Sequence, residues 1–207
     1  MGNIIIRKGK LEDSIPSNFL IYSTGSYFFD HVFYYEKEKI FVLLKQLFEK
    51  NKGVFSHKFS SVAELDGKVV GIEHGYTKNE RAIHSLFSSL YIIRQHRLGE
   101  IAGMLRRNYH LGRFIKKIHP DSYYIAHLAV LQEFHGKGIG TKLLENSFKK
   151  AISLRSTSCL LDVSIHNKNA IKLYEKMGFK IFKEIRNPAL EEMHKLHGQY
   201  RMIKRLK

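Results

Sequence analysis

The 207-residue sequence contains one cysteine, Cys159, so no disulfide can form within the chain. It also lacks any run near the roughly 18 apolar residues that a membrane-spanning helix needs. The apolar stretch Ile4–Ile6 is too short for the core of a signal peptide, and no repeat or low-complexity tail is visible. These absences predict a single cytoplasmic domain over residues 1–207, with no membrane partner.

Acidic residues are scarce beside basic ones, with 19 Asp and Glu against 35 Lys and Arg and a net charge of +16. Such a balance suits an anionic ligand, an acidic substrate or a nucleic acid, and it is equally typical of a solvated basic surface. No zinc, RRM or helix-turn-helix signature accompanies the charge, so a nucleic-acid partner rests on charge alone. The histidines show no metal-ligand spacing, and no metal site is expected.

The stretch from Tyr123 to Glu145 carries the most informative pattern. The apolar run Tyr124–Val130 predicts a buried strand, and three glycines at alternate positions follow it. An amphipathic helix comes next, and its predicted apolar face consists of Ile139, Leu143, Leu144, Phe148 and Ile152. Glycines let the backbone approach a ligand closely, and the unpaired N–H groups of a helix start can cradle phosphate oxygens.

The glycine spacing by itself is a weak signal, because a structural tight turn explains it about as well. Two common nucleotide motifs are excluded. The Walker loop would need a glycine, four further residues and then Gly-Lys-Ser/Thr, and no such spacing occurs. The Rossmann fingerprint would need a third glycine where Thr141 stands.

The rest of the chain predicts an alternation of strands and helices. The dipeptide Asp66-Gly67 is a strong hairpin signal between two strands. Aromatic-rich residues 15–35 favour helix only weakly. The other predicted strands are Asn3–Lys8, Val62–Leu65, Lys68–Ile72 (continuing to Tyr76), Cys159–Ile165, Lys180–Ile185 and Tyr200–Leu206; the other predicted helices are Glu36–Lys50, Ala82–Arg94, Leu98–Tyr109 and Asn167–Met177.

Two segments, LAVLQEFHGKGIGTKLLE and HNKNAIKLYEKMGFK, resemble the paired motifs of the GNAT family of N-acetyltransferases. The family's loop reads Arg/Gln-x-x-Gly-x-Gly/Ala. This chain matches at Gly138 and Gly140 and departs at His135, which stands in the place of Arg or Gln. The resemblance implies an α/β (α+β) fold with a mixed, mostly antiparallel sheet, helices on both faces and a splayed central strand pair.

The resemblance also implies acetyl-CoA as co-substrate. The pantetheine arm would lie in the gap of the splayed strands and pair with main-chain groups of Leu128 and Val130, so apolar side chains suffice there. Residues expected to bind the cofactor are Leu128, Ala129, Val130, His135, Gly136, Lys137, Gly138, Ile139, Gly140, Thr141 and Asn167.

The family usually joins its third and fourth strands directly, so the basic residues 78–119 resemble an insertion near the acceptor entrance. This helical insertion could select an acidic or bulky acceptor, or it could be a solvated basic face. Glu73, His74 and Tyr76, near the end of the preceding strand, are candidate acceptor contacts.

The implied reaction moves an acetyl group from acetyl-CoA to a primary amine of a small molecule or peptide. The Val130 N–H would stabilise the oxyanion and Tyr174 would protonate the leaving thiolate. Asp162, His127 and Glu73 are alternative bases. A non-catalytic acyl-CoA-binding protein, a basic nucleic-acid-binding module and a homodimer stay open.

Overall fold

The computed structural model describes residues 3–33, 36–96, 99–103, 118–186 and 198–206. Its strands are β1 (Ile4–Lys8), β2 (Ser60–Leu65), β3 (Lys68–Thr77), β4 (Ser122–Val130), β5 (Ser158–Ser164), β6 (Lys180–Ile185) and β7 (Gln199–Arg205). Its α-helices are α1 (Ser14–Ser23), α2 (Ser26–Phe33), α3 (Lys37–Glu49), α4 (Lys78–Arg94), α6 (Ile139–Ser153) and α7 (Lys168–Lys176), with 3₁₀ turns η1 (Leu11–Asp13), η2 (His57–Phe59) and η3 (Gln132–Phe134).

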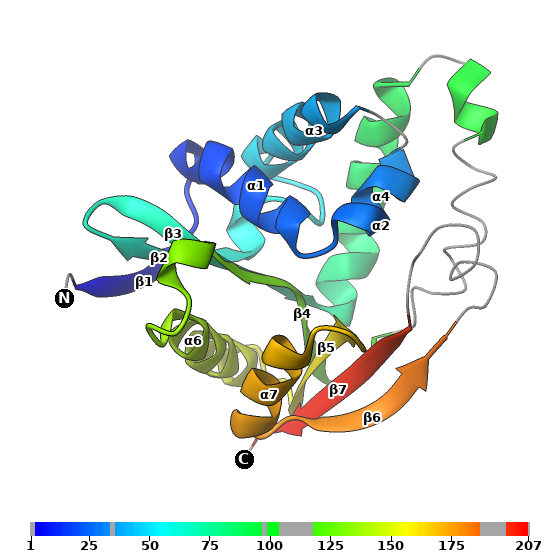
Figure 1. Cartoon of the computed structure of the whole chain (residues 1–207). Coiled ribbons are helices and arrows are strands. Elements are labelled where there is room, and N and C mark those ends of the chain that lie inside the picture. The colour runs from blue at the N-terminus through cyan, green and yellow to red at the C-terminus, as the bar shows by residue number, and fades with distance from the viewer. Residues whose placement is uncertain (1–2, 34–35, 97–98, 104–117, 187–197, 207) are drawn as a thin grey trace.

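The strands form one sheet in the order β1-β2-β3-β4-β5-β7-β6, in which only the β4–β5 pair is parallel. Helices α1 to α4 lie over one face, and α6 and α7 lie over the other (Figure 1). Successive side chains of a strand point to opposite faces, so a strand can pack against helices on both sides. In β2, Val62 packs into the cluster under α1–α3, and its neighbour Ala63 packs under α6. The predicted mixed sheet with helices on both faces is confirmed.

The hairpin between β2 and β3 turns at the predicted dipeptide. Asp66 and Gly67 both have positive φ, 49° and 77°. Two successive left-handed residues match the twist of the flanking strands, which is why this dipeptide is the commonest hairpin signal.

Helix α4 begins at Lys78, four residues before the predicted start at Ala82. The Thr77 hydroxyl accepts the backbone N–H of Glu80, and the Glu80 carboxylate accepts the backbone N–H of Thr77. This capping box fixes the helix start, and it is legible in the sequence as Thr-x-x-Glu. Of the second predicted helix, Leu98–Tyr109, residues 99–103 are helical, and the residues at 98 and 104–109 lie outside the described part of the chain.

Helix α6 buries Ile139, Leu143 and Leu144 as predicted, but Ile152 is 53% exposed. Ile152 lies in the last turn of the helix, beyond the core cluster that covers the earlier turns. Cys159 is completely buried in β5, as expected of a small apolar residue. Among the described helices, none has the length and apolar content needed to cross a bilayer.

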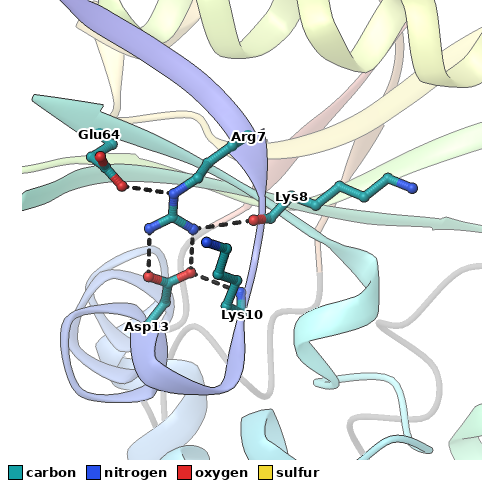
Figure 2. A network of polar contacts seen from close by, with 5 residues as sticks. All are labelled: Arg7, Lys8, Lys10, Asp13 and Glu64. Atoms are coloured by element: carbon teal, nitrogen blue, oxygen red, sulfur yellow. Dashed lines mark hydrogen bonds and ion pairs between the residues drawn. The ribbon is translucent and has the colours of Figure 1, made fainter. Parts of the chain in front are cut away.

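Arg7 of β1 ties the N-terminal strand to its surroundings (Figure 2). Its guanidinium donates to both carboxylate oxygens of Asp13 at 2.7 and 2.8 Å and to Glu64 of β2 at 2.7 Å. Burial alone would raise the pKa of Asp13, but the bonds from Arg7 and from the Lys10 N–H lower it below its usual value. The fork geometry therefore fixes η1, and with it the start of α1, against the sheet edge.

We predict that Phe29→Ala lowers the free energy of unfolding by about 3–5 kcal/mol, because the Phe29 side chain is 1% exposed and packs among Tyr22, Phe33 and Phe55. Urea denaturation measures the loss. Tyr27→Ala on the same helix is the control, because Tyr27 is 63% exposed and should cost under about 0.5 kcal/mol. Equal losses in the two variants would contradict this placement of the core.

Candidate active site

Strands β4 and β5 pair for only part of their length. Ser122–Ile125 pairs with Ser158–Leu161, and beyond these residues β4 has no partner on that side within the described chain. On its other side β5 pairs with β7 along its whole length, from Ser158 to Ser164. The two central strands therefore part at Ile125, as predicted, and a gap opens beside the second half of β4.

The backbone of β4 presents hydrogen-bonding groups to this gap. The Leu131 N–H donates to Val70 of β3 at 2.9 Å. Because successive residues of a strand point their backbone groups to opposite sides, Val130 and Leu128 direct theirs toward the gap, away from β3. That these main-chain groups pair with a ligand stays a prediction.

The glycine loop leads from the gap to the start of α6. Gly136 and Gly138 both have a φ of +75°, and a Cβ at either position would meet no atom within 4 Å. Gly138 is the N-cap, and the Lys142 N–H makes the first helical bond to its carbonyl. The N–H groups of the first turn, at residues 139–141, precede the helical bonding pattern and can receive an anion.

Other loop residues have packing roles. Ile139 is 1% exposed and belongs to the core under α6. A Cβ on Gly140 would lie 3.1 Å from Leu173 of α7, so this glycine permits close approach of two helices. Its expected role in binding the cofactor stays a prediction. The Lys137 ammonium lies 4.7 Å from the ring centre of Phe134, where the aromatic face attracts it. Thr141 is half-buried in the first turn of α6.

His135, the residue that departs from the family pattern, turns back onto the strand. Its Nε2 lies 2.8 Å from the carbonyl oxygen of Val130. A carbonyl only accepts, so Nε2 carries a proton and donates it. The Val130 carbonyl is thus already bonded, and the Val130 N–H is the backbone group of this residue left to face the gap.

His127 lies on the face of the sheet that α1 to α4 cover, at an irregularity in β4. His74 pairs with His127 and Gly75 pairs with Ile125, so Ala126 is an extra residue on β4. Such a bulge re-aims the side chains beside it. The half-buried His127 ring lies between Phe29 and Phe55, at centroid distances of 5.7 and 6.0 Å. Burial lowers the pKa of His127 to about 4, so the ring is neutral at pH 7.

Asp162 on β5 is engaged in a three-residue contact. Arg201 of β7 donates to both of its carboxylate oxygens at 2.7 and 2.6 Å, and the Tyr124 hydroxyl donates to it at 3.0 Å. Asp162 and Arg201 are both largely enclosed, with side chains 12% and 7% exposed. Contacts of this kind are typical of a structural carboxylate, and no local sequence pattern pointed to Arg201 as the partner.

Glu73 and His74 have no exposed area, so neither can touch an acceptor in this conformation, contrary to the expectation for this strand end. Tyr76 is 9% exposed. Glu73 lies on the α6 face, where it accepts from Tyr123 at 2.9 Å, and burial raises its pKa. His74 lies on the opposite face, where its Nε2 donates to the Val54 carbonyl and its Nδ1 accepts from Ser60 at 2.7 Å.

Tyr174 and Asn167 come from α7, which follows β5. Tyr174 packs against Phe179, and burial raises its pKa to about 12, so its hydroxyl keeps its proton at neutral pH. No described side chain is hydrogen-bonded to that hydroxyl, and it is not among the described polar atoms sealed from solvent without a partner. Asn167 is the N-cap of α7, and its Oδ1 accepts the Ala170 N–H at 3.1 Å.

Within the described residues, no group of three or more His, Cys, Asp or Glu is arranged to hold a metal ion. A surface hollow lined by Arg7, Asp13, Lys68 and their neighbours lies at the β1 end of the sheet, and no candidate residue lines it. The candidate site is therefore the β4–β5 gap, with the glycine loop at one end and His127 beside the bulge.

The model of the family described as "Acetyltransferase (GNAT) family" matches residues 26–179, which is most of the chain. An N-alpha-acetyltransferase of Sulfurisphaera tokodaii is 30% identical over 132 residues, covering 61% of this chain and 59% of that protein. The chain spans smaller shares of two proteins named N-alpha-acetyltransferase 30, 41% for Schizosaccharomyces pombe and 20% for Xenopus laevis. It therefore covers less than two thirds of the length of these relatives.

Two solved structures share the fold. An N-acetyltransferase from Staphylococcus aureus Mu50 superposes with a TM-score of 0.71 at 21% identity, covering 97% of this chain and 100% of that one. The PaiA N-acetyltransferase from Thermoplasma acidophilum, solved in complex with coenzyme A, gives a TM-score of 0.55 at 16% identity, with 99% of each chain covered.

The buried His74 predicts a pH-dependent stability. Burial, with a smaller contribution from His127, lowers the pKa of His74 from 6.5 to about 3. Between these values the unfolded chain binds a proton that the folded chain does not. The contribution of His74 to the free energy of unfolding is therefore fully present above pH 6.5. It is lost as pH decreases toward 3, by up to roughly 1.4 kcal/mol per pH unit.

Urea unfolding of the wild type and of His74→Gln, compared between pH 7 and pH 5, measures this slope. The free energy of unfolding of the variant should fall less between pH 7 and pH 5 than that of the wild type, whatever its value at pH 7. His119→Gln is the control, because His119 is exposed. An unchanged slope in His74→Gln would show that His74 does not stay neutral in the folded protein.

Proposed function

The chain belongs to the acetyltransferase (GNAT) family, and on this premise we propose that it transfers an acetyl group from acetyl-CoA to a primary amine. The observation that carries the proposal is the continuous path from the β4–β5 gap to the left-handed glycine loop at the start of α6. The gap offers a strand-like row of backbone groups, and the loop offers unpaired N–H groups. A pantetheine arm followed by a pyrophosphate needs these two environments in this order.

The cofactor would lie along the gap with its pyrophosphate at the loop. The N–H groups of residues 136–141 and the ammonium of Lys137 would neutralise the phosphate charge. The pantetheine amides would pair with Leu128 and with the N–H of Val130, while Ala129, whose side chain packs in the core under α1–α3, contributes through the strand. Asn167, at the exposed start of α7, is the residue proposed to contact the cofactor from the β5 side.

The proposed chemistry is direct attack. A neutral amine nitrogen adds to the thioester carbonyl, and a backbone N–H of β4, that of Val130, stabilises the oxyanion. The carbon–sulfur bond then breaks, Tyr174 gives its proton to the thiolate, and the amine proton passes to a base. We assign the base to His127 because Asp162 is occupied by Arg201 and Tyr124, and Glu73 is buried on the opposite face.

The acceptor would approach from the face that carries α1 to α4. Helix α4 packs against α3, β3 and β4 on that side, so the insertion at 78–119 would border the acceptor entrance. Residues 104–117 of this insertion, which include Arg106 and Arg107, lie outside the described residues. The relatives named N-alpha-acetyltransferase make peptide α-amines the first acceptor class to try, with polyamines as the second.

We predict that Gly138→Val reduces acetyl-CoA affinity at least about tenfold, because the side chain would project into the open space over the loop and a β-branched residue strains at φ +75°. Calorimetry with acetyl-CoA measures the affinity. The matched control is Gly67→Val, which carries the same strain at φ +77° in the distant hairpin turn. Equal affinities in folded Gly138→Val and wild type would refute the loop as the pyrophosphate site, and binding of nucleic acid in place of acetyl-CoA would refute the function.

We predict that Tyr174→Phe lowers turnover by roughly 10²–10⁴-fold, the range typical of a general acid, with little change in acetyl-CoA affinity. The ring and its packing against Phe179 are kept, and only the proton donor is lost. Release of free thiol with a panel of peptide and polyamine acceptors provides the measurement. Tyr91→Phe, which removes the hydroxyl that donates to Gln46 between α4 and α3, is the control. Near-normal turnover in Tyr174→Phe would leave that hydroxyl a packing feature.

A further inference from the structure

Thr24, at the end of α1, makes two short contacts with one hydroxyl group. Its Oγ1 lies 2.7 Å from the carbonyl oxygen of Ile21, one turn back in the same helix. The same Oγ1 lies 2.7 Å from Nδ1 of His127, which is 103 positions away along the chain. A contact between residues so far apart leaves no local pattern from which it could be predicted.

Counting protons decides the direction of both bonds. A carbonyl oxygen only accepts, so the single hydroxyl proton of Thr24 is donated to Ile21. Were that proton turned toward His127, two oxygens would face each other at 2.7 Å with no proton between them. Thr24 must therefore accept from His127, and Nδ1 of the neutral ring carries the hydrogen. By elimination, Nε2 carries the lone pair.

The residues around His127 favour a neutral ring with an available Nε2. The neighbours of His127 are the Phe29 and Phe55 rings and His74, whose ring centre is 5.8 Å away. His74 is itself held neutral between Ser60 and Val54, so no charged group among these contacts competes for the proton. Nε2 of His127 has no hydrogen-bond partner among the described residues. Thr24 is exposed, so the Nδ1 side of the His127 ring lies next to a surface residue.

We propose that Thr24 is a positioning residue that holds His127 in the Nδ1–H form, so that Nε2 can take the proton of the attacking amine. The inference rests on the proposed function. As the nitrogen–carbon bond forms and the carbon–sulfur bond breaks, the amine proton moves to Nε2 and Tyr174 protonates the thiolate. The turn between α1 and α2, where Thr24 lies, would thereby set the protonation of the base in β4.

Nitrogen NMR of ¹⁵N-histidine-labelled protein tests the tautomer directly at pH 7. His127→Gln, which lacks one signal set, identifies the His127 resonances. We expect the Nδ1–H pattern in the wild type. In Thr24→Val, which keeps the shape and removes the hydroxyl, we expect a shift toward Nε2–H. Nε2–H as the dominant form in the wild type would overturn the proposal, as would an unchanged pattern in folded Thr24→Val.

Kinetics then test the consequence. Thr24→Val should lower kcat about tenfold, the effect of one lost hydrogen bond, with no change in acetyl-CoA affinity. Thr24→Ser should restore most of the loss. Ser23→Ala is the matched control, because the Ser23 hydroxyl makes the same kind of bond to Leu20, and no described contact links it to His127. A fall in kcat equal in Ser23→Ala and Thr24→Val would reduce Thr24 to a helix-end role.

Failure of the proposed acetyl transfer and failure of the proposed role of Thr24 would give different results. If the chain does not bind acetyl-CoA or release thiol, the proposed function fails while the tautomer of His127 is still readable. If the chain transfers acetyl groups and His127→Gln is fully active, His127 is not the base, and Thr24 loses its proposed role even if it sets the tautomer. A tautomer shift with a kcat loss in Thr24→Val, rescued by Thr24→Ser, supports the proposal.

Discussion

The contact of Tyr124 with Asp162, held in turn by Arg201, lies where the two central strands part. Backbone pairing between β4 and β5 ends at Ile125 and Leu161, and Asp162 is the next residue of β5. On its other side β5 pairs with β7 along its whole length, which places Asp162 opposite Arg201. A protein is strongly destabilised when a largely buried carboxylate loses its cation. This ion pair therefore favours one geometry for the point where β4 and β5 separate. The gap, the loop beyond it and the approach to His127 depend on that geometry.

The sheet then separates two sets of buried polar groups. Glu73 and His74 are consecutive in β3 and therefore point to opposite faces. Glu73 joins Tyr123 beneath α6, in a region closed by helix packing. His74 and His127 share the other face with Phe29 and Phe55, beneath helices α1 to α4. The extra residue Ala126 in β4 permits this arrangement, because without it the pairing that sets His127 opposite His74 would shift by one residue.

Local patterns were sufficient wherever a neighbouring residue determines the conformation. The apolar run of β4, the Asp66-Gly67 turn, the glycine loop and the periodic face of α6 were all predicted from residues a few positions apart. The capping box at Thr77 could have been found in the same way and would have corrected the start of α4. Local patterns were insufficient for Gly140, whose closest neighbour is Leu173 on another helix, and for His135, whose side chain folds back onto Val130.

The sequence by itself determined the order of strands and helices, the family and the loop where a phosphate could bind, because turn chemistry and hydrophobic period act over a few residues. Tertiary structure alone decided which polar groups meet. The carboxylate of Asp162 is bonded to Arg201, Glu73 is buried beside Tyr123, and the hydroxyl of Thr24 meets a histidine from a distant strand. Each of these contacts joins segments that only sheet formation and helix packing bring within hydrogen-bonding distance, and one sequence carries no local trace of them.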